Sequence, residues 1–106
     1  MLNKIPAVDA EGFLQQLNDW TPDVAEWIAQ QEKISLTPDH WEVIYLVKKF
    51  YQEFELSPSM RPLVKYVGNH FGAEKGKSIY LMQLFPPSPA KLAAKIAGLP
   101  KPANCL

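Results

Sequence analysis

The side chain with the clearest chemistry is a single cysteine, Cys105, the penultimate residue of the stretch KPANCL. A thiolate is a strong nucleophile, and the fraction of thiolate is set by the pKa of the thiol. The adjacent terminal carboxylate is expected to raise that pKa, whereas Lys101 or the cations of a partner would lower it. Two readings follow: an exposed cysteine without a role, or a thiol presented to the active site of another macromolecule.

The other residues with catalytic or metal-binding potential are two histidines, which the sequence favours as structural or surface residues. His40 and His70 are thirty positions apart and have no cysteine nearby, so their spacing does not match a zinc site. No Ser-His-Asp order, glycine-rich phosphate loop or dinucleotide fingerprint is visible. The sequence therefore predicts no metal and no cofactor.

Positive charge is concentrated in the second half of the chain. Residues 1–59 carry four lysines and ten acidic side chains, a net charge of −6, whereas residues 60–106 carry seven Lys or Arg side chains against one Glu, a net charge of +6. This asymmetry predicts one acidic face and one basic face, and it makes an anionic partner plausible. Arg61 and Lys65, one helical turn apart, are candidate contacts to phosphate groups.

Composition indicates one soluble domain. The chain has 106 residues, of which 47% are hydrophobic and 21% charged, values ordinary for a globular protein. The first residues contain no uninterrupted apolar segment typical of a signal peptide, and no run is long enough to span a membrane. A single cysteine cannot form an internal disulfide, so nothing argues for secretion. We expect a cytoplasmic protein.

Periodic apolar residues and helix-start signals predict a mainly helical fold. Ser or Thr precedes Pro at Thr21, Thr37, Ser57 and Ser88, and this pair is typical of a helix start. Helices are expected over 38–54, 60–70, 78–85 and 89–97, with two shorter ones within 9–17 and 21–32. Residues 2–8 can pair as a small β element, which Pro6 keeps short. Residues 38–85 can form a helix-turn-helix-like trio, and the three tryptophans are expected in or beside the core.

The pattern changes after Gly98, which closes the last predicted helix. Pro100 and Pro102 remove backbone donors and disfavour helix before them, so residues 99–106 are expected to form an extended arm on a helical domain of residues 1–98. The seven positions from Leu99 to Cys105 could reach about 23–25 Å from the end of the last helix.

The arm KIAGLPKPANCL closely resembles the carboxy-terminal arm of the DsrC/TusE/DsvC family of sulfur carriers. The likeness extends upstream through LTPDHWEVIYLVKKFYQEF, SPSMRPLVKYV and FGAEKGKSIYLMQLFP, and it covers roughly residues 11–106. It implies a small, orthogonally packed helical domain with a flexible arm, on which Cys105 would carry sulfur and Gly98 would act as the hinge. Pro62 stands where a larger apolar residue is expected in relatives.

The resemblance also indicates a branch of the family. Members that are partners of dissimilatory sulfite reductase use a second arm cysteine eleven residues earlier, and that position here is Ala94. The chain therefore resembles the single-cysteine TusE type of sulfurtransferase. That type relays persulfide sulfur from a TusBCD-type complex to an MnmA-type tRNA 2-thiouridylase bound to tRNA. Arg61, Lys65 and Lys101 are then candidates for docking or electrostatic steering.

Two alternatives remain open at this point. One is a redox protein associated with sulfite reductase. The presence of Ala94 in place of a second cysteine argues against it. The other is a helix-turn-helix regulator that binds nucleic acid, against which the zero net charge and the sparse basic residues speak.

Overall fold

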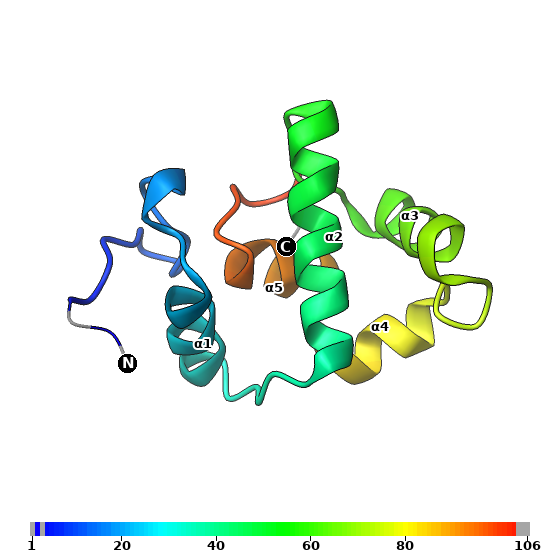
Figure 1. The fold of residues 1–106 in the computed structure, drawn as a ribbon, viewed down its shortest axis with the longest axis horizontal. Helices are drawn as coiled ribbons and strands as arrows, with labels where there is room; N and C mark the ends of the chain where they lie inside the picture. The colour runs from blue at the N-terminus through cyan, green and yellow to red at the C-terminus, as the bar shows by residue number, and fades with distance from the viewer. Residues whose placement is uncertain (1, 3, 104–106) are drawn as a thin grey trace.

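The computed structural model describes residue 2 and residues 4–103, which form a mainly helical domain (Figure 1). A short 3-10 helix, η1 (Leu17–Asp19), precedes the five α-helices of this region. These are α1 (Pro22–Gln31), α2 (Pro38–Phe54), α3 (Met60–Phe71), α4 (Ser78–Leu84) and α5 (Pro89–Ile96). The predicted helical fold class is thus confirmed.

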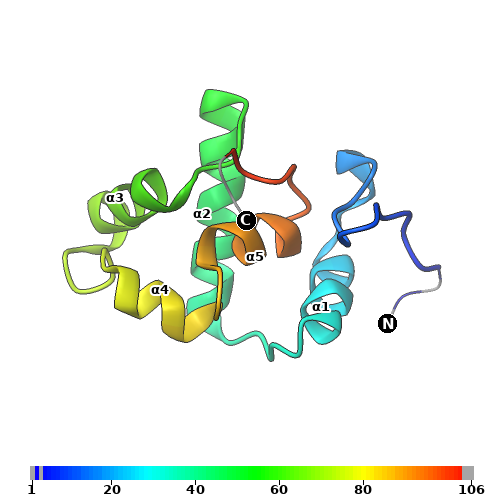
Figure 2. The ribbon, with the colours of Figure 1, turned by 180° about the vertical axis from the view of Figure 1, so that it is seen from behind.

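The hydrophobic core is built around α5. Every residue of α5 except Lys91 is buried, and the helix packs against α1, α2, α3 and α4. Figure 1 shows α5 behind α2, and Figure 2 shows it in front of α2; in both views α5 lies between α1 on one side and the α3–α4 pair on the other. Because α5 is the central helix, the segment that follows it leaves from the middle of the domain.

Two helices begin as their Thr-Pro pairs predict. The Thr21 hydroxyl oxygen accepts the Val24 N–H at 3.1 Å, and Thr37 forms a capping box with His40 at the start of α2. His40 Nδ1 accepts the Thr37 N–H at 3.1 Å, while His40 Nε2 lies 2.7 Å from the carbonyl oxygen of Leu84. The Nε2–H tautomer satisfies both bonds, so this buried histidine joins the start of α2 to the end of α4. The structural role expected for His40 is confirmed.

The helix predicted over residues 60–70 is present as α3, but the Ser57-Pro58 pair does not cap it as the sequence pattern suggested. Helix α3 starts at Met60, and Ser59, its N-cap residue, makes no side-chain capping bond. The Ser57 side chain is instead directed to residue 100, as described below. The hydroxyl therefore stabilises a long-range contact in place of a helix end.

The helix predicted within residues 9–17 is also wrong. Asp9 Oδ1 accepts the N–H groups of Glu11 and Phe13 at 2.9 and 3.0 Å, and Gly12 adopts a positive φ of 93°. The Asp side chain competes with helical bonding and holds a turn. Val8 and Leu14 then form an isolated antiparallel bridge, so the expected N-terminal β element is reduced to this single bridge within the described residues.

The tryptophans lie where the sequence predicts. Trp20, Trp27 and Trp41 are partly buried and pack against the main core. Of the helices described, none is long and apolar enough to cross a membrane.

Four of the seven basic side chains in the second half of the chain form ion pairs with acidic side chains of the first half. Lys75 contacts Glu42 and Asp39, Lys95 contacts Glu32, and Lys91 and Lys101 both contact Glu11. Four lysines of the second half therefore lie beside acidic side chains of the first half and do not contribute to a separate basic face. Within the described residues, the basic side chains of the second half that form no ion pair are Arg61, Lys65 and Lys77.

Candidate functional site at the base of the arm

The end of α5 fixes the direction in which the arm leaves the domain. Gly98 N–H donates to the Lys95 carbonyl at 3.1 Å, and Leu99 N–H donates to the Ala94 carbonyl at 2.9 Å. This pair of bonds, with Gly98 at φ +75°, is a Schellman motif. A Cβ on Gly98 would lie 2.5 Å from Trp20 Cδ1, so only glycine fits between the helix end and the indole ring. The predicted hinge residue is thus buried against Trp20 in this conformation.

Two side chains from other elements donate hydrogen bonds to carbonyl groups at the C-terminal end of α5. Trp20 Nε1 donates to the Ile96 oxygen at 2.8 Å, and Lys48 Nζ donates to the Ala97 oxygen at 3.3 Å. The Lys48 ammonium also lies 3.8 Å from the centre of a Trp20 ring, a cation–π contact. A cation at a helix C-terminus is favourable, although partial burial lowers the pKa of Lys48.

The first residues of the arm are held on the domain rather than free of it. The Leu99 side chain is only 4% exposed and belongs to the core cluster, and Pro102 is also buried. Ser57 Oγ donates to the Pro100 carbonyl at 2.6 Å. Figure 2 shows this segment running from the end of α5 toward the connection between α2 and α3.

An ion pair provides a further attachment. Lys101 Nζ lies 3.1 Å from Glu11 Oε2, and Lys91 Nζ lies 3.6 Å from the same oxygen. Hydrogen bonding and the charge of Lys101, followed by the charge of Lys91, lower the pKa of Glu11. The Asp9 turn positions this carboxylate. We call the contacts of Leu99, Pro100, Lys101 and Pro102 with the domain the arm clamp.

Cys105 lies outside the described residues. Covalent geometry nevertheless limits its distance from Pro102. Two residues lie between it and Pro102, the last buried residue of the clamp, so the interval is three Cα–Cα steps. At most about 10–11 Å of chain is available over that interval. This value is less than half of the reach predicted for an arm that is free from Leu99 onward.

The remaining predicted site residues fall in two groups. Gly98 and Lys101 lie together at the base of the arm, whereas Arg61 and Lys65 are exposed on α3 and form no ion pair with a described residue. Ala94, in place of a second cysteine, is 1% exposed. The sequence reasoning missed Trp20, Lys48, Ser57 and Glu11 as supports of the arm, because their distance along the chain from residues 96–101 gives no local signal.

Together, the fold and the site define a small helical domain that presents a carboxy-terminal segment from its central helix. Comparison of the sequence with protein families identifies the family to which this domain belongs. The family model described as DsrC like protein matches residues 2–106. The chain belongs to this DsrC-like family.

Curated relatives carry the name sulfurtransferase TusE. The Escherichia coli K12 protein of that name is 54% identical over 98 residues, which cover 92% of this chain and 90% of the relative. The Yersinia pseudotuberculosis protein is 52% identical over 103 residues, covering 97% of this chain and 95% of the relative.

Solved structures of the same fold carry the name DsrC. Allochromatium vinosum DsrC has a TM-score of 0.85 and 48% identity, covering 93% of this chain and 88% of the other. The oxidized gamma-subunit of the dissimilatory sulfite reductase (DsrC) from Archaeoglobus fulgidus has a TM-score of 0.82 and 35% identity, covering 95% and 92%.

Proposed function

We propose that this protein is a sulfur carrier that accepts persulfide sulfur on Cys105 and delivers it for 2-thiolation of wobble uridine in tRNA. Relatives named sulfurtransferase, at more than half identity over most of the chain, support a sulfur-transfer role. The observation that carries the assignment to one residue is the position of the single cysteine of the chain, three residues beyond the arm clamp.

The transfer is an exchange between sulfur atoms without net oxidation. The Cys105 thiolate attacks the outer sulfur of a donor persulfide, R–S–SH, forming a Cys105 Sγ–S bond as the donor S–S bond breaks. The donor leaves as R–S⁻, and the proton stays with the Cys105 persulfide. Delivery repeats the step in reverse, with a thiolate of the acceptor attacking the outer sulfur and Cys105 leaving as thiolate.

The proposed partners are a TusBCD-type donor complex and an MnmA-type tRNA thiouridylase with its tRNA. The clamp supports such a handover because it limits the part of the chain that must be ordered on insertion into a partner. Ordering fewer free residues costs less conformational entropy. Within the proposal, Gly98 allows the turn into the arm, and Arg61 and Lys65 steer or dock partners. Docking through Lys101 would require a partner carboxylate to replace Glu11.

The sulfite-reductase alternative is not favoured. A disulfide or trisulfide within the arm requires a second thiol, and the buried Ala94 offers none. The nucleic-acid regulator is not favoured either, because four of the seven basic side chains in the second half contact acidic residues of the first.

Mass spectrometry tests the proposal. Incubation with a persulfide donor should add about 32 Da, one sulfur atom, at Cys105, and reductant should remove it. Cys105→Ser should retain the helical fold, gain no mass and fail to support wobble 2-thiouridine in cells. Normal 2-thiouridine in cells that contain only Cys105→Ser would reject the proposal.

A further inference from the structure

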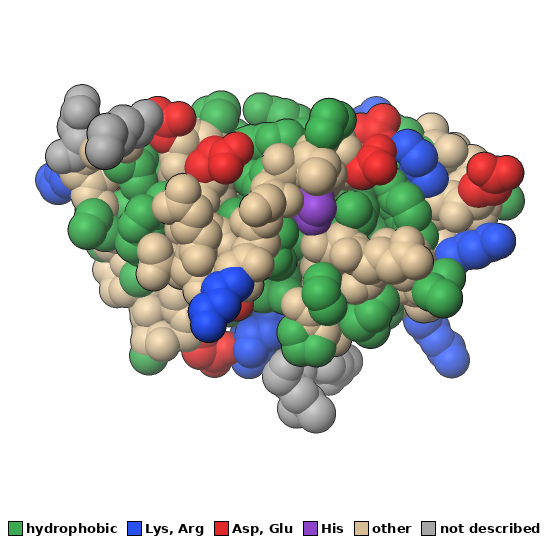
Figure 3. Space-filling model, turned by 90° about the horizontal axis from the view of Figure 1, so that it is seen from below, with side chains coloured by type: hydrophobic (Ala, Val, Ile, Leu, Met, Phe, Trp, Pro, Cys, Tyr) green, Lys and Arg blue, Asp and Glu red, His purple; other side chains and the backbone are tan. Residues whose placement is uncertain are grey.

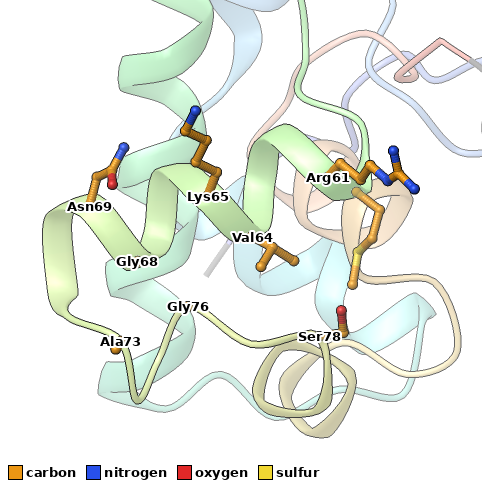
Figure 4. A pocket seen from close by; sticks show the side chains of 9 residues that line it. Arg61, Val64, Lys65, Gly68, Asn69, Ala73, Gly76 and Ser78 are labelled. Atoms are coloured by element: carbon orange, nitrogen blue, oxygen red, sulfur yellow. The ribbon is translucent and has the colours of Figure 1, made fainter.

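A hollow of about 460 Å³ lies between α3 and the segment that leads into α4. Its lining includes the apolar side chains of Met60, Val64 and Ala73 together with Gly68 and Gly76. Figure 4 shows the Val64 side chain directed into the hollow and Ser78 at its lower edge. We call this hollow the α3–α4 groove. Its base is apolar.

The two glycines bring the backbones of the groove into contact. A Cβ on Gly76 would lie 2.5 Å from Gly68 Cα, so no larger residue fits at Gly76 without displacement. The Gly76 N–H also donates to the Gly72 carbonyl at 3.1 Å, which holds the loop in a turn. One wall of the groove is therefore a fixed backbone surface.

The same loop is fastened to α2 by Lys75. Its Nζ lies 2.7 Å from Glu42 Oε1 and 3.6 Å from Asp39 Oδ1. Both contacts raise the pKa of Lys75, with the Glu42 hydrogen bond as the largest cause. The groove is thus preformed, and a ligand would not have to order it.

The rim of the groove carries cations that lack intramolecular partners. Arg61 and Lys65 belong to its lining. Figure 4 shows the Arg61 side chain extending sideways from the beginning of α3, whereas the Lys65 side chain leaves the helix on the side opposite Val64. Lys77 directly precedes Ser78 and is exposed. These are the basic residues of the second half left unpaired within the described chain. Figure 3 shows Lys and Arg side chains projecting beside hydrophobic ones at the α3–α4 end of the molecule.

We propose that the α3–α4 groove docks an acidic amphipathic segment of a partner protein. Apolar side chains of that segment would pack on Met60 and Val64, and its carboxylates would pair with Arg61, Lys65 and Lys77. An apolar base with a cationic rim fits this chemistry better than it fits nucleic acid, which is bound through phosphate contacts and base stacking on aromatic rings. Among the described residues that line the groove, none is aromatic. The proposal makes no assumption about Cys105.

The test uses the full-length protein and synthetic helical peptides of roughly 14 residues, about four turns. The probe peptide has Leu along one face and Glu elsewhere. One control peptide has the same composition in scrambled order, and another has Lys in place of Glu. Titration into ¹⁵N-labelled protein should shift the amide signals of Val64, Gly68 and Gly76 with the probe peptide only.

Charge-reversal variants inside and outside the groove locate the site. R61E/K65E should weaken binding of the probe peptide at least about tenfold, equivalent to about 1.4 kcal/mol, and should bind the Lys peptide instead. Lys49→Glu is the control, because Lys49 is exposed on α2 and lies outside the groove lining. Both variants alter surface positions, and circular dichroism should show the fold retained.

Four outcomes would overturn the proposal. They are absence of probe-peptide binding, equal binding of the scrambled peptide, equal weakening by Lys49→Glu, and tighter binding of an RNA hairpin that shifts the same amides. A separate readout keeps the proposed function distinct: the unaltered protein should gain one sulfur at Cys105 from a small-molecule persulfide, and failure of that loading would count against the proposed function but not against the groove.

Discussion

Glu11 and Lys101 are ninety residues apart in the chain, and their side chains form an ion pair with a nitrogen–oxygen distance of 3.1 Å. This pair connects the turn that precedes the first helix to the arm that follows the last one. Because it is exposed, it is expected to adjust the mobility of the arm more than the stability of the domain.

Acidification should therefore loosen the arm. The pKa of Glu11 lies below its ordinary value of 4.5, so the paired state is favoured above that value and loses its advantage as the pH falls through the lowered pKa. Hydrogen exchange and ¹⁵N relaxation of Lys101 and Ala103, measured in steps from about pH 6 to about pH 3, should show rising mobility. Glu11→Gln should be mobile at every pH, and a pH response that persists in this variant would contradict the assignment.

Gly98→Ala should destabilise the protein more than Gly72→Ala. Both glycines have positive φ, +75° and +100°, but a Cβ at Gly98 would overlap Trp20 whereas one at Gly72 meets nothing within 4 Å. The backbone penalty is about 1–3 kcal/mol at each site, and packing should add about 1–3 kcal/mol at Gly98. Urea unfolding measures both. Equal losses would show that Trp20 can move aside.

Leu99→Ala should cost about 2–5 kcal/mol of unfolding free energy, as for other buried leucines. The side chain is 4% exposed, although it belongs to the arm by sequence. Leu56→Ala is the matched control, because Leu56 is 55% exposed, and its change should stay within about 0.5 kcal/mol. Similar small effects for both variants would mean that the arm leaves the domain at Leu99 in solution.

His40→Phe should cost about 1–3 kcal/mol, since it leaves the Leu84 carbonyl without its donor and removes the capping box of α2. His70→Phe replaces an exposed histidine whose one recorded hydrogen bond is to Tyr66 within the same helix. Its effect should lie within about 0.5 kcal/mol. Thermal unfolding of both variants at pH 7 compares them, and equal midpoints would contradict the linking role of His40.

The sequence predicted the helices well wherever the signal was local. Thr37-Pro38 and the apolar spacing that follows it placed α2 with the same bounds as the structure. The helix predicted within residues 9–17 is absent because the Asp9 side chain accepts the N–H groups of Glu11 and Phe13 and so stabilises a turn. Apolar spacing does not reveal this competing hydrogen bonding.

The arm was predicted only in part. Two prolines correctly excluded helix over residues 99–103. They carry no information about packing, so the burial of Leu99 and the hydrogen bond from Ser57 could not be predicted from the sequence. The charge asymmetry had the same limit. It gave the sign of each half but not the pairing of Glu11, Glu32 and Glu42 with lysines far away.

The arm clamp limits the length of chain that can extend beyond the surface of the domain. Under the proposed function, and as long as the contacts of Glu11 and Ser57 with the arm persist, Cys105 would enter a partner protein no farther than about 10–11 Å beyond Pro102. Enzymes whose receiving sulfur is buried more deeply are then out of range, whatever their surface chemistry. Selection among acceptor proteins would thus depend on the depth of the receiving sulfur below their surface. Inserting residues after Pro102 would allow Cys105 to reach acceptors with more deeply buried sulfur.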